Sequence, residues 1–212
     1  MELVKDLKRS AGIIIVDLKA QFRHEIKNKI CSYSQDTLKK KSQAMISLLH
    51  KLLTPFSGLW AAYRPMKSEP QIEFDSVFPQ IQWAYPVTDH SQLQFKKQVS
   101  GWKKSALGVS EPTDGEIAQL TSFEGFLIPC LGLSTQGHRL GRGAGFYDRT
   151  FSDKNLTNNF KIGLKIGLCF SDAFLADVPS ESHDLLLDVG VTEQGIYFFN
   201  NTIKNIFNGV GE

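Results

Sequence analysis

A glycine loop flanked by arginines stands near the middle of the chain, and its residue types and spacing suit phosphate binding. The loop runs from Arg139 to Gly145 with the sequence RLGRGAG, and Phe146–Arg149 after it predict the first turn of a helix. Free backbone N–H groups in such a loop, together with the helix dipole, favour an anion. Arg139 and Arg142 add positive charge and forked donors. We therefore expect a phosphate site here.

The glycines by themselves match no familiar nucleotide motif. Gly141, Gly143 and Gly145 alternate, which permits positive φ and close approach of the backbone to a ligand. The loop lacks the Gly-Lys-Ser/Thr ending of a Walker loop, and it is not GxGxxG. A mobile connector with solvated arginines is the alternative interpretation. Asp148, just inside the expected helix, either favours the helix dipole or holds Mg²⁺ beside a bound phosphate.

A helix expected over residues 16–33 carries further cations. Its apolar positions recur at helical spacing, while Lys19, Arg23 and Lys27 follow one another every four residues. Such a stripe is usually a solvated basic face. The residue pattern alone leaves open whether these side chains face water or an anion.

The remaining elements alternate between helix and strand. Ser34 offers an N-cap for a helix that Pro55 and Gly58 end, and short apolar runs between Pro and Gly predict strands. Strand, helix and strand in succession with short connections imply parallel pairing with right-handed crossovers. The expected helices are 35–53 and 71–78, the expected strands are 59–63, 82–87, 127–129, 161–170 and 195–199, antiparallel strand and loop cover 91–106, and a poorly ordered tail or short helix follows Asn200.

Several motifs in order along the chain resemble one family. The run RLGRGAGFYDR, preceded by IPCLGLSTQGH, is similar to the signature of 5-formyltetrahydrofolate cyclo-ligases, and Gly108–Pro112 (GVSEP) resembles a Gly-x-x-Glu-Pro turn of the same family. The sequence departs from the family pattern in three places. Leu133-Ser134 stands where relatives usually have Phe-Asp, Phe146 replaces a tyrosine, and Ala173 replaces a glutamine, so the first departure bears on loop geometry or catalytic competence.

The resemblance implies a fold, a reaction and a set of site residues. The fold is three-layer α/β/α with a mainly parallel central sheet and N-terminal helices. The reaction converts 5-formyltetrahydrofolate, a reduced folate, to 5,10-methenyltetrahydrofolate with ATP and Mg²⁺. Implied roles are catalysis for Arg142, metal binding for Asp148 and folate binding for Glu69 and Tyr147. Those implied for nucleotide binding are Lys19, Arg23, Arg139, Gly141, Gly143, Ala144, Gly145, Phe146 and Tyr147.

Bulk properties narrow the class of protein. The chain has 212 residues, 42% of them hydrophobic, and a net charge of +2, which is too small to indicate a dedicated nucleic-acid binder. Three separated cysteines form no CxxC pair, and no apolar run approaches a membrane span. We expect a single domain over 1–212 with residues 1–18 as a possible extension, a cytoplasmic setting and a monomer.

Two other functions stay open at this stage. One is a degenerate relative that binds nucleotide without ligase activity, which the Leu133-Ser134 departure permits. The other is a module whose arginine loop grips RNA phosphates, and the low net charge counts against it. His183 has no second histidine at ligand spacing, so we interpret it as a loop or core residue.

Overall fold

The computed structural model describes residues 2–152, 162–181 and 183–208, with side chains from Ile15 onward. The helices are α1 (Glu2–Cys31), α2 (Gln35–Leu53), α3 (Phe74–Val77), α4 (Phe146–Thr150) and α5 (Asn201–Asn208). The strands are β1 (Leu59–Ala61), β2 (Gln82–Asp89), β3 (Gln92–Lys97), β4 (Trp102–Lys104), β5 (Ser110–Pro112), β6 (Glu116–Ala118), β7 (Gly125–Pro129), β8 (Gly132–Ser134), β9 (Arg139–Leu140), β10 (Leu164–Leu168), β11 (Phe174–Leu175), β12 (Val189–Thr192) and β13 (Gly195–Phe198).

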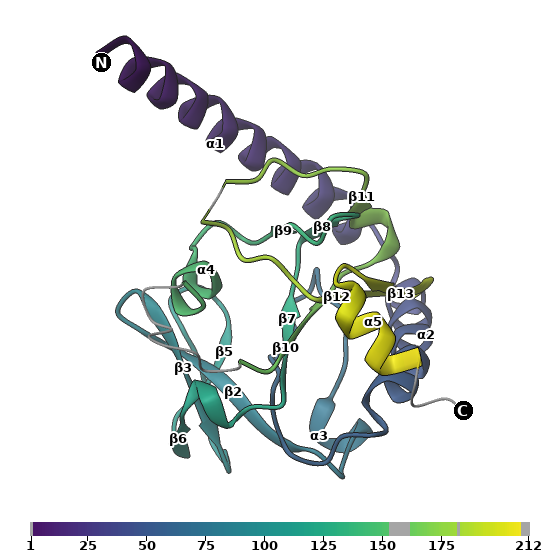
Figure 1. Cartoon of the computed structure of the whole chain (residues 1–212). Helices are drawn as coiled ribbons and strands as arrows, with labels where there is room; N and C mark the ends of the chain where they lie inside the picture. The colour runs from purple at the N-terminus through teal and green to yellow at the C-terminus, as the bar shows by residue number, and fades with distance from the viewer. Residues whose placement is uncertain (1, 153–161, 182, 209–212) are drawn as a thin grey trace.

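A twisted eight-stranded sheet runs through the middle of the molecule (Figure 1). Its order is β13-β12-β10-β7-β1-β2-β3-β6; the five strands from β12 to β2 pair in parallel, and the outer pairings are antiparallel. The chain passes from β1 outward to β2, and from β7 outward in the opposite direction to β10 and β12. Neighbouring parallel strands whose connections leave in opposite directions open a crevice at their carboxyl ends. The predicted α/β fold with a mainly parallel sheet is confirmed.

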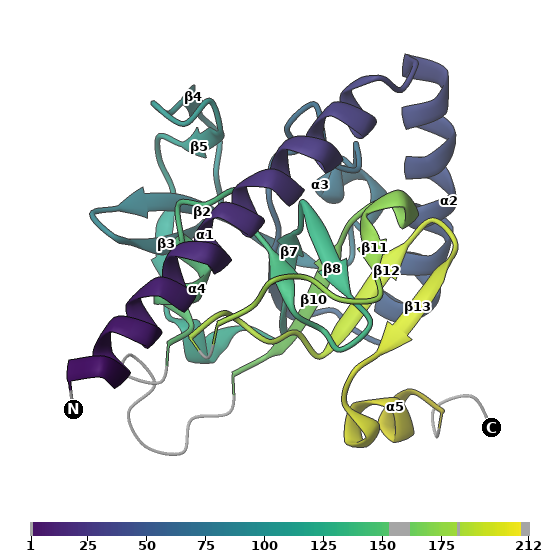
Figure 2. The same cartoon turned by 90° about the horizontal axis from the view of Figure 1, so that it is seen from above.

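The two faces of the sheet are covered differently. Alternation along β7 sends Phe126 and Ile128 to one apolar cluster and Leu127 to another. The Leu127 cluster lies under α2, α3 and α5. The opposite cluster lies under α1, α4 and a small sheet of β11, β8 and β9, so this outer layer is part strand rather than all helix (Figures 1 and 2).

The two N-terminal helices form as predicted, and the first is longer. α1 begins at Glu2 instead of Val16, so residues 2–18 of the expected extension are its opening turns. α2 spans the predicted 35–53, and the Ser34 side chain accepts a hydrogen bond of 3.1 Å from the Thr37 amide. That bond satisfies one of the free donors that begin any helix. The connection of three residues places α1 and α2 on opposite faces of the sheet.

Several predicted boundaries shift. The helix expected over 71–78 is reduced to α3, the strand expected over 59–63 ends at Ala61, and the C-terminal segment is a helix, α5. A proline in a strand is typical of a sheet edge or a strand end, and Pro86 lies in β2, inside the sheet. β1 pairs only with residues 82–84 of β2, so the missing Pro86 amide removes no bond to β1. Lys161, the expected start of β10, lies outside the described residues.

Candidate active site

The glycine loop begins at the carboxyl end of β7, reached through a tight hairpin. β8 and β9 pair antiparallel, and residues 135–138 turn between them. Ser134 is fully buried, and its Oγ accepts hydrogen bonds from the amides of Gln136 (3.2 Å) and His138 (3.1 Å). A short polar side chain closes the turn in the way an aspartate does. Ser134 thus keeps the hairpin that aims the loop, and the departure from the family pattern does not disrupt it.

The loop requires glycine at three positions for two different reasons, backbone conformation and lack of space. Gly143 and Gly145 adopt φ of +106° and +68°, a region that other residues rarely occupy. Gly141 has no such φ; a Cβ there would lie 2.8 Å from Nη2 of Arg139. The predicted helix after the loop is α4, a single short turn. The loop therefore depends on backbone freedom at two positions and on space at the third.

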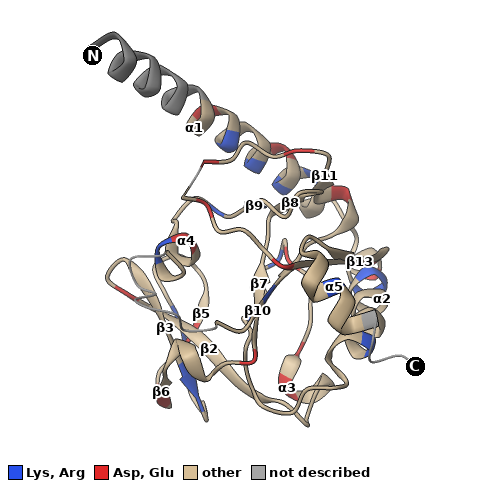
Figure 3. Cartoon of the chain, in the orientation of Figure 1, with Lys and Arg blue, Asp and Glu red and all other residues tan. Residues whose placement is uncertain are grey.

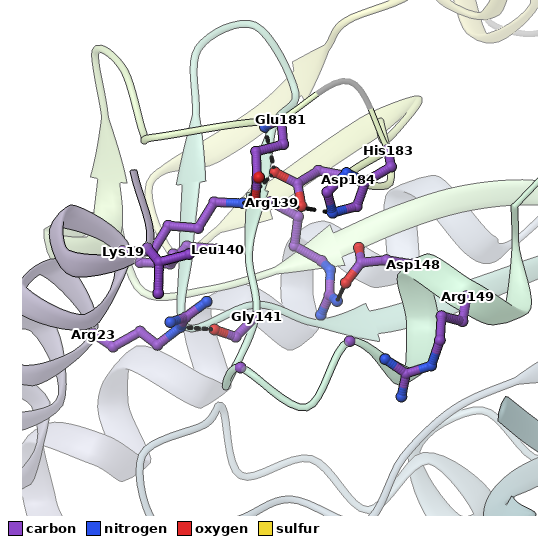
Figure 4. A pocket seen from close by; sticks show the side chains of 13 residues that line it. Lys19, Arg23, Arg139, Leu140, Gly141, Asp148, Arg149, Glu181, His183 and Asp184 are labelled. Atoms are coloured by element: carbon purple, nitrogen blue, oxygen red, sulfur yellow. Dashed lines mark hydrogen bonds and ion pairs between the residues drawn. The ribbon is translucent and has the colours of Figure 1, made fainter. Parts of the chain in front are cut away.

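One side of the loop opens into a cavity of about 430 Å³, which we call the polar cavity (Figure 4). α1 forms one wall, the loop and α4 another, and the segment around residue 183 a third. Charged side chains predominate in it. They are Lys19, Arg23, Arg139, Asp148, Arg149, Glu181, His183 and Asp184, joined by Val16, Leu140, Gly141, Gly143 and Gly145.

Two cations of α1, Lys19 and Arg23, line this cavity, whereas Lys27 is exposed and does not. Blue segments, which mark Lys and Arg, recur along the part of α1 that lies over the rest of the molecule (Figure 3). Arg23 donates from Nε to the Gly141 carbonyl oxygen at 2.8 Å, which fixes the loop to the helix. Burial, and to a smaller degree the Arg139 cation, lowers the pKa of Arg23, against the opposite effect of Asp184. A guanidinium stays charged at neutral pH all the same.

Lys19 is the most enclosed of these cations. It is 7% exposed, and its Nζ contacts Glu181 Oε2 at 2.9 Å and Asp184 Oδ2 at 2.6 Å. Burial lowers the pKa of Lys19, but hydrogen bonds and charge from Asp184 and Glu181 outweigh it, and the net pKa is raised. Lys19 is therefore a fixed positive charge, and it sits against two acids that sequence reasoning did not assign.

Arg139 forms the partition of the site, because it lines the polar cavity and also a second one. Its guanidinium donates to the Pro129 carbonyl oxygen at 3.2 Å, lies 3.4 Å from Asp148 Oδ2, and stands 5.0 Å from the centre of the Tyr147 ring. Asp148 also accepts a bond of 3.1 Å from the Leu185 amide. Arg139 and Asp148, predicted for nucleotide and metal binding, are therefore each held by several contacts.

The second cavity, about 350 Å³, lies on the other side of the loop, and we call it the apolar cavity. Most of its wall comes from carbon-rich side chains after β1, on β2 and β3, at the β4–β5 turn and on α4. They are Tyr63, Met66, Pro86, Leu93, Leu107, Val109, Pro129, Ala144, Gly145, Phe146 and Tyr147; its charged or hydroxyl members are Lys27, Arg64, Glu69, Thr88, Glu111, Arg139 and Arg142.

Two residues predicted for separate roles meet in the apolar cavity. Arg142 Nε donates to Glu69 Oε1 at 2.9 Å, and Arg142 Nη2 donates to Ser68 Oγ at 2.7 Å. The Glu69 side chain is 5% exposed and accepts a second bond from the Met66 amide at 2.7 Å. Glu69 follows β1 and Arg142 follows β7, the two strands between which the connections diverge. The crevice expected at that point is where the pair lies.

The structure divides the predicted nucleotide set between the cavities. Lys19, Arg23, Gly141 and Gly143 line the polar cavity, and Arg139 and Gly145 line both. The others, Ala144, Phe146 and Tyr147, line only the apolar cavity. Burial raises the pKa of Tyr147, more than Arg139 lowers it, so its hydroxyl stays protonated at neutral pH.

Sequence reasoning missed Glu181 and Asp184 as cavity residues. Their carboxylates and His183 have ligand atoms within 4.8 Å of one another. Both acids stand within four residues of each other beside His183, but they belong to no periodic element from which a common direction could be predicted. His183 is exposed, at 70% of its side chain. The interpretation of His183 as a loop residue agrees with its place in the irregular segment before β12.

A sequence model of the 5-formyltetrahydrofolate cyclo-ligase family matches residues 18–193 of this chain. The chain belongs to this family. The match spans both cavities, from Lys19 on α1 to the loop after β12. The membership predicted from the glycine loop is thus confirmed, and the matched range contains the loop, Lys19, Arg23 and the acidic segment.

Relatives and solved structures agree with that membership. The chain is 25% identical over 114 residues to a mouse 5-formyltetrahydrofolate cyclo-ligase, covering 52% of this chain and 56% of the relative, and 35% identical over 98 residues to one from Mycolicibacterium smegmatis, covering 45% and 48%. The chain thus spans about half the length of these curated relatives. A further match, which covers 27% of a 5-formyltetrahydrofolate cyclo-ligase from Arabidopsis thaliana, is to a protein named mitochondrial.

The fold itself is shared with solved structures. An Aquifex aeolicus 5,10-methenyltetrahydrofolate synthetase has a TM-score of 0.71 at 24% identity, with 86% of this chain and 93% of that chain covered. A Mycoplasma pneumoniae synthetase has a TM-score of 0.67 at 24% identity, with 82% and 98% covered. At this identity the likeness shows the fold alone. In the described part of this chain, no helix has the length and apolar character needed to cross a membrane.

Proposed function

We propose that this protein converts 5-formyltetrahydrofolate to 5,10-methenyltetrahydrofolate with ATP and Mg²⁺, releasing ADP and phosphate. The observation that carries the proposal is the pair of cavities on the two sides of one glycine loop. One is lined by cations that suit a triphosphate, and the other has the apolar walls and carboxylates that suit a folate. Such a loop can bring a γ-phosphate to a group bound on its other side.

The chemistry needs both compartments because a formamide oxygen is a poor leaving group. The oxygen of the N5-formyl group attacks the γ-phosphorus, and ADP departs. N10 then attacks the activated formyl carbon and gives up its proton, and phosphate leaves with the former formyl oxygen. The product holds one carbon between N5 and N10. The protein contributes by positioning the two substrates and by stabilising the charge on the phosphoryl group in the transition state of its transfer.

The residues on the polar side bind and orient the triphosphate. Lys19, Arg23 and Arg139 supply positive charge, and the backbone N–H groups of 141–145 supply further donors. Arg142 extends from the same loop into the apolar cavity, where Glu69 holds its guanidinium. We propose that Arg142 stabilises the charge that develops as the phosphoryl group crosses to the formyl oxygen, with Glu69 and Tyr147 beside the folate. Ala144 and Phe146 complete the wall between the ligands.

The donor set of the polar cavity fits Mg²⁺. Asp148, Glu181 and Asp184 offer carboxylate oxygens on one cavity, and Mg²⁺ prefers oxygen ligands that it shares with substrate phosphates. Asp148 is the proposed ligand, and Glu181 and Asp184 are the other acids of the same cavity that could contribute oxygen ligands. When bound, the ion would neutralise phosphate charge beside the arginines.

Absorbance of methenyltetrahydrofolate in the near ultraviolet tests the proposed reaction. The protein is mixed with Mg-ATP and 5-formyltetrahydrofolate, and we expect a rise that requires ATP. Glu116→Gln, which changes an exposed acid on β6, serves as the control and should keep the full rate. ATP binding without any rise would instead support a degenerate relative whose Ser134 and Ala173 departures matter. Steeply salt-dependent binding of RNA would support the phosphate-binding module.

The whole chain is proposed to act alone as one domain. We propose a monomer that binds a reduced folate and no nucleic acid, in a cytoplasmic setting. All three cysteines are free thiols, which agrees with a reducing compartment. Light scattering of the purified protein measures the mass directly, and a value near twice the 23.8 kDa of the chain would contradict the monomer.

A further inference from the structure

The apolar cavity contains polar atoms that the protein does not satisfy. Among the described residues, the Tyr63 hydroxyl and Arg139 Nε are buried without a hydrogen-bond partner, and both side chains line this cavity. Buried polar groups in folded proteins are nearly always paired. Unpaired atoms gathered on one cavity therefore indicate a polar ligand that pairs them.

Glu111 is the charged member of this under-paired set. It is 4% exposed, lies in the middle of β5 and lines the apolar cavity. Within the described ranges its carboxylate has one donor, the Thr88 hydroxyl, at 3.0 Å from Oε1 and 3.3 Å from Oε2. No lysine or arginine of those ranges comes within ion-pair distance of Glu111. One hydroxyl leaves most of the acceptor capacity of two carboxylate oxygens unused.

Glu69, the other carboxylate of the cavity, is in the opposite condition. One of its oxygens accepts from the Arg142 guanidinium and the other from the Met66 amide. A buried carboxylate with neither a cation nor backbone amides is costly, and it persists where function requires it. The free carboxylate acceptor in this cavity is thus Glu111, although Glu69 was the one of these two acids that was expected to bind the folate.

We propose that Glu111 accepts two parallel hydrogen bonds from the amino-pyrimidine edge of the reduced folate, a proposal that rests on the proposed function. The pterin ring presents a 2-amino group and an N3–H side by side, and their spacing matches the two oxygens of a carboxylate. The apolar walls around Glu111 suit the flat ring, and the Tyr63 hydroxyl is available to its remaining polar atoms. Glu111 thereby fixes which edge of the ring lies deep and leaves the formyl group towards Arg142.

Calorimetry without ATP tests this contact apart from turnover. Binding of 5-formyltetrahydrofolate is compared with binding of its 2-desamino analogue, in the wild type and in Glu111→Gln. The wild type should prefer the natural compound by about 10- to 100-fold, since loss of a bond to a charged group has that effect. Glu111→Gln should bind the natural compound about 10- to 100-fold more weakly and lose most of the preference. Unchanged preference in Glu111→Gln overturns the proposal.

A structural role for Glu111 makes a different set of predictions. The Thr88–Glu111 bond also ties β5 to β2, so Thr88→Val removes that tie and leaves the carboxylate in place. We expect Thr88→Val to keep the preference for the 2-amino compound and to melt lower than the wild type. Glu111→Gln should melt no lower, because a buried charge is replaced by an amide. If both variants lose stability alike and keep the preference, Glu111 only holds β5.

The outcomes separate this inference from the proposed reaction. A wild type that forms methenyltetrahydrofolate, with Glu111→Gln unchanged in KM and in preference, upholds the reaction and overturns the role of Glu111. A wild type that binds 5-formyltetrahydrofolate through Glu111 but forms no product upholds the contact and overturns the reaction. For an active enzyme we expect KM for the folate to rise in Glu111→Gln while KM for ATP stays the same.

Discussion

Arg142 and Glu69 show how tightly one residue's function depends on another. The arginine comes from the loop after β7 and the acid from the segment after β1, and they meet at 2.9 Å. The pair holds the guanidinium in the apolar cavity. Substitution of Arg142 therefore changes two things at once, the positive charge that we propose acts on the phosphoryl group and the partner of a buried carboxylate.

Arg142→Ala is expected to lower kcat by at least about 10²–10³-fold, the usual effect of removing one preorganised charge. It should also lower the free energy of unfolding by about 1–3 kcal/mol, because Glu69 is left buried with only the Met66 amide. Adding Glu69→Gln should restore the melting temperature and leave the activity low. Recovery of both together would mean that Arg142 acts only through stability.

At the scale of elements, the glycine loop gives a matched pair of substitutions. Gly143→Ala places a side chain at φ +106° without a clash, since the Cβ would lie in ordinary van der Waals contact, 3.5 Å from the Arg23 guanidinium carbon. Strain of this kind costs about 1–3 kcal/mol. Gly141→Ala has no such strain and instead displaces Arg139. We expect Gly143→Ala to lower the melting temperature, and Gly141→Ala to raise KM for ATP with a smaller change in melting. The reverse order would contradict these two reasons.

The junction of α1 and α2 is held to the sheet by a charged cluster outside both cavities. Asp172, after β10, pairs with Lys41 at 2.8 Å and with Lys29 at 2.9 Å and accepts a bond from the Tyr33 hydroxyl. The hydrogen bond from Lys41, then those from Tyr33 and Lys29, hold the pKa of Asp172 well below its usual value. Because α1 carries Lys19 and Arg23, this cluster also sets the position of the polar cavity's wall.

That pKa shift predicts a dependence of stability on acid. A carboxyl whose folded pKa is lowered stabilises the fold above its unfolded pKa, and the contribution is lost as pH falls from about 4 through the folded value. Asp172→Asn should melt about 3–6 °C below the wild type at pH 7, and the gap should narrow towards pH 2. Asp36→Asn, which breaks an exposed pair with Lys40, should show a much smaller gap. A gap for Asp172→Asn that is constant with pH contradicts the ionic origin.

Elements with a strong local pattern were predictable, and those held by tertiary contacts were not. The N-cap at Ser34 and the apolar period of residues 35–53 predict α2 correctly at both ends. β8, β9 and β11 have three, two and two residues, too few for any period to emerge. The helix expected over 71–78 is reduced to α3, and Gln71, its expected first residue, instead forms hydrogen bonds with Ser42 and Met66.

At the scale of the whole molecule, the candidate site also has parts that the local sequence predicts and parts that only tertiary contacts create. The residues of the glycine loop could be predicted as site candidates because they are contiguous in the sequence. Alternating glycines flanked by arginines indicate anion binding. Their partners were not, since Arg142 meets Glu69 across 73 positions of sequence and Lys19 meets Asp184 across 165. Only the fold brings β1, β7 and α1 to one crevice. The two-cavity arrangement likewise follows from the loop's path and not from its composition.

Because the cavities lie on opposite sides of the loop, metal removal should separate the two ligands. With excess EDTA we expect turnover to stop, while calorimetric binding of 5-formyltetrahydrofolate in the absence of ATP changes less than about twofold. The three acids proposed for Mg²⁺, Asp148, Glu181 and Asp184, line only the polar cavity. Loss of folate binding with EDTA would place the metal in the apolar cavity instead. Return of activity on addition of Mg²⁺ is the control for damage by the chelator.

Lys19 serves as a resident counterion for Glu181 and Asp184 until ligand arrives. With Mg-ATP bound as proposed, the Lys19 ammonium can pair with a phosphate oxygen instead of the two acids. The carboxylates of Glu181 and Asp184 are then free to bind the divalent ion. Neither component achieves this exchange alone: free ATP would leave the two acids uncompensated, and free Mg²⁺ would leave Lys19 without an anion. The enzyme would thus recognise Mg-ATP as a unit because only the intact complex balances all of these charges. This recognition would not require any contact with the base of the nucleotide.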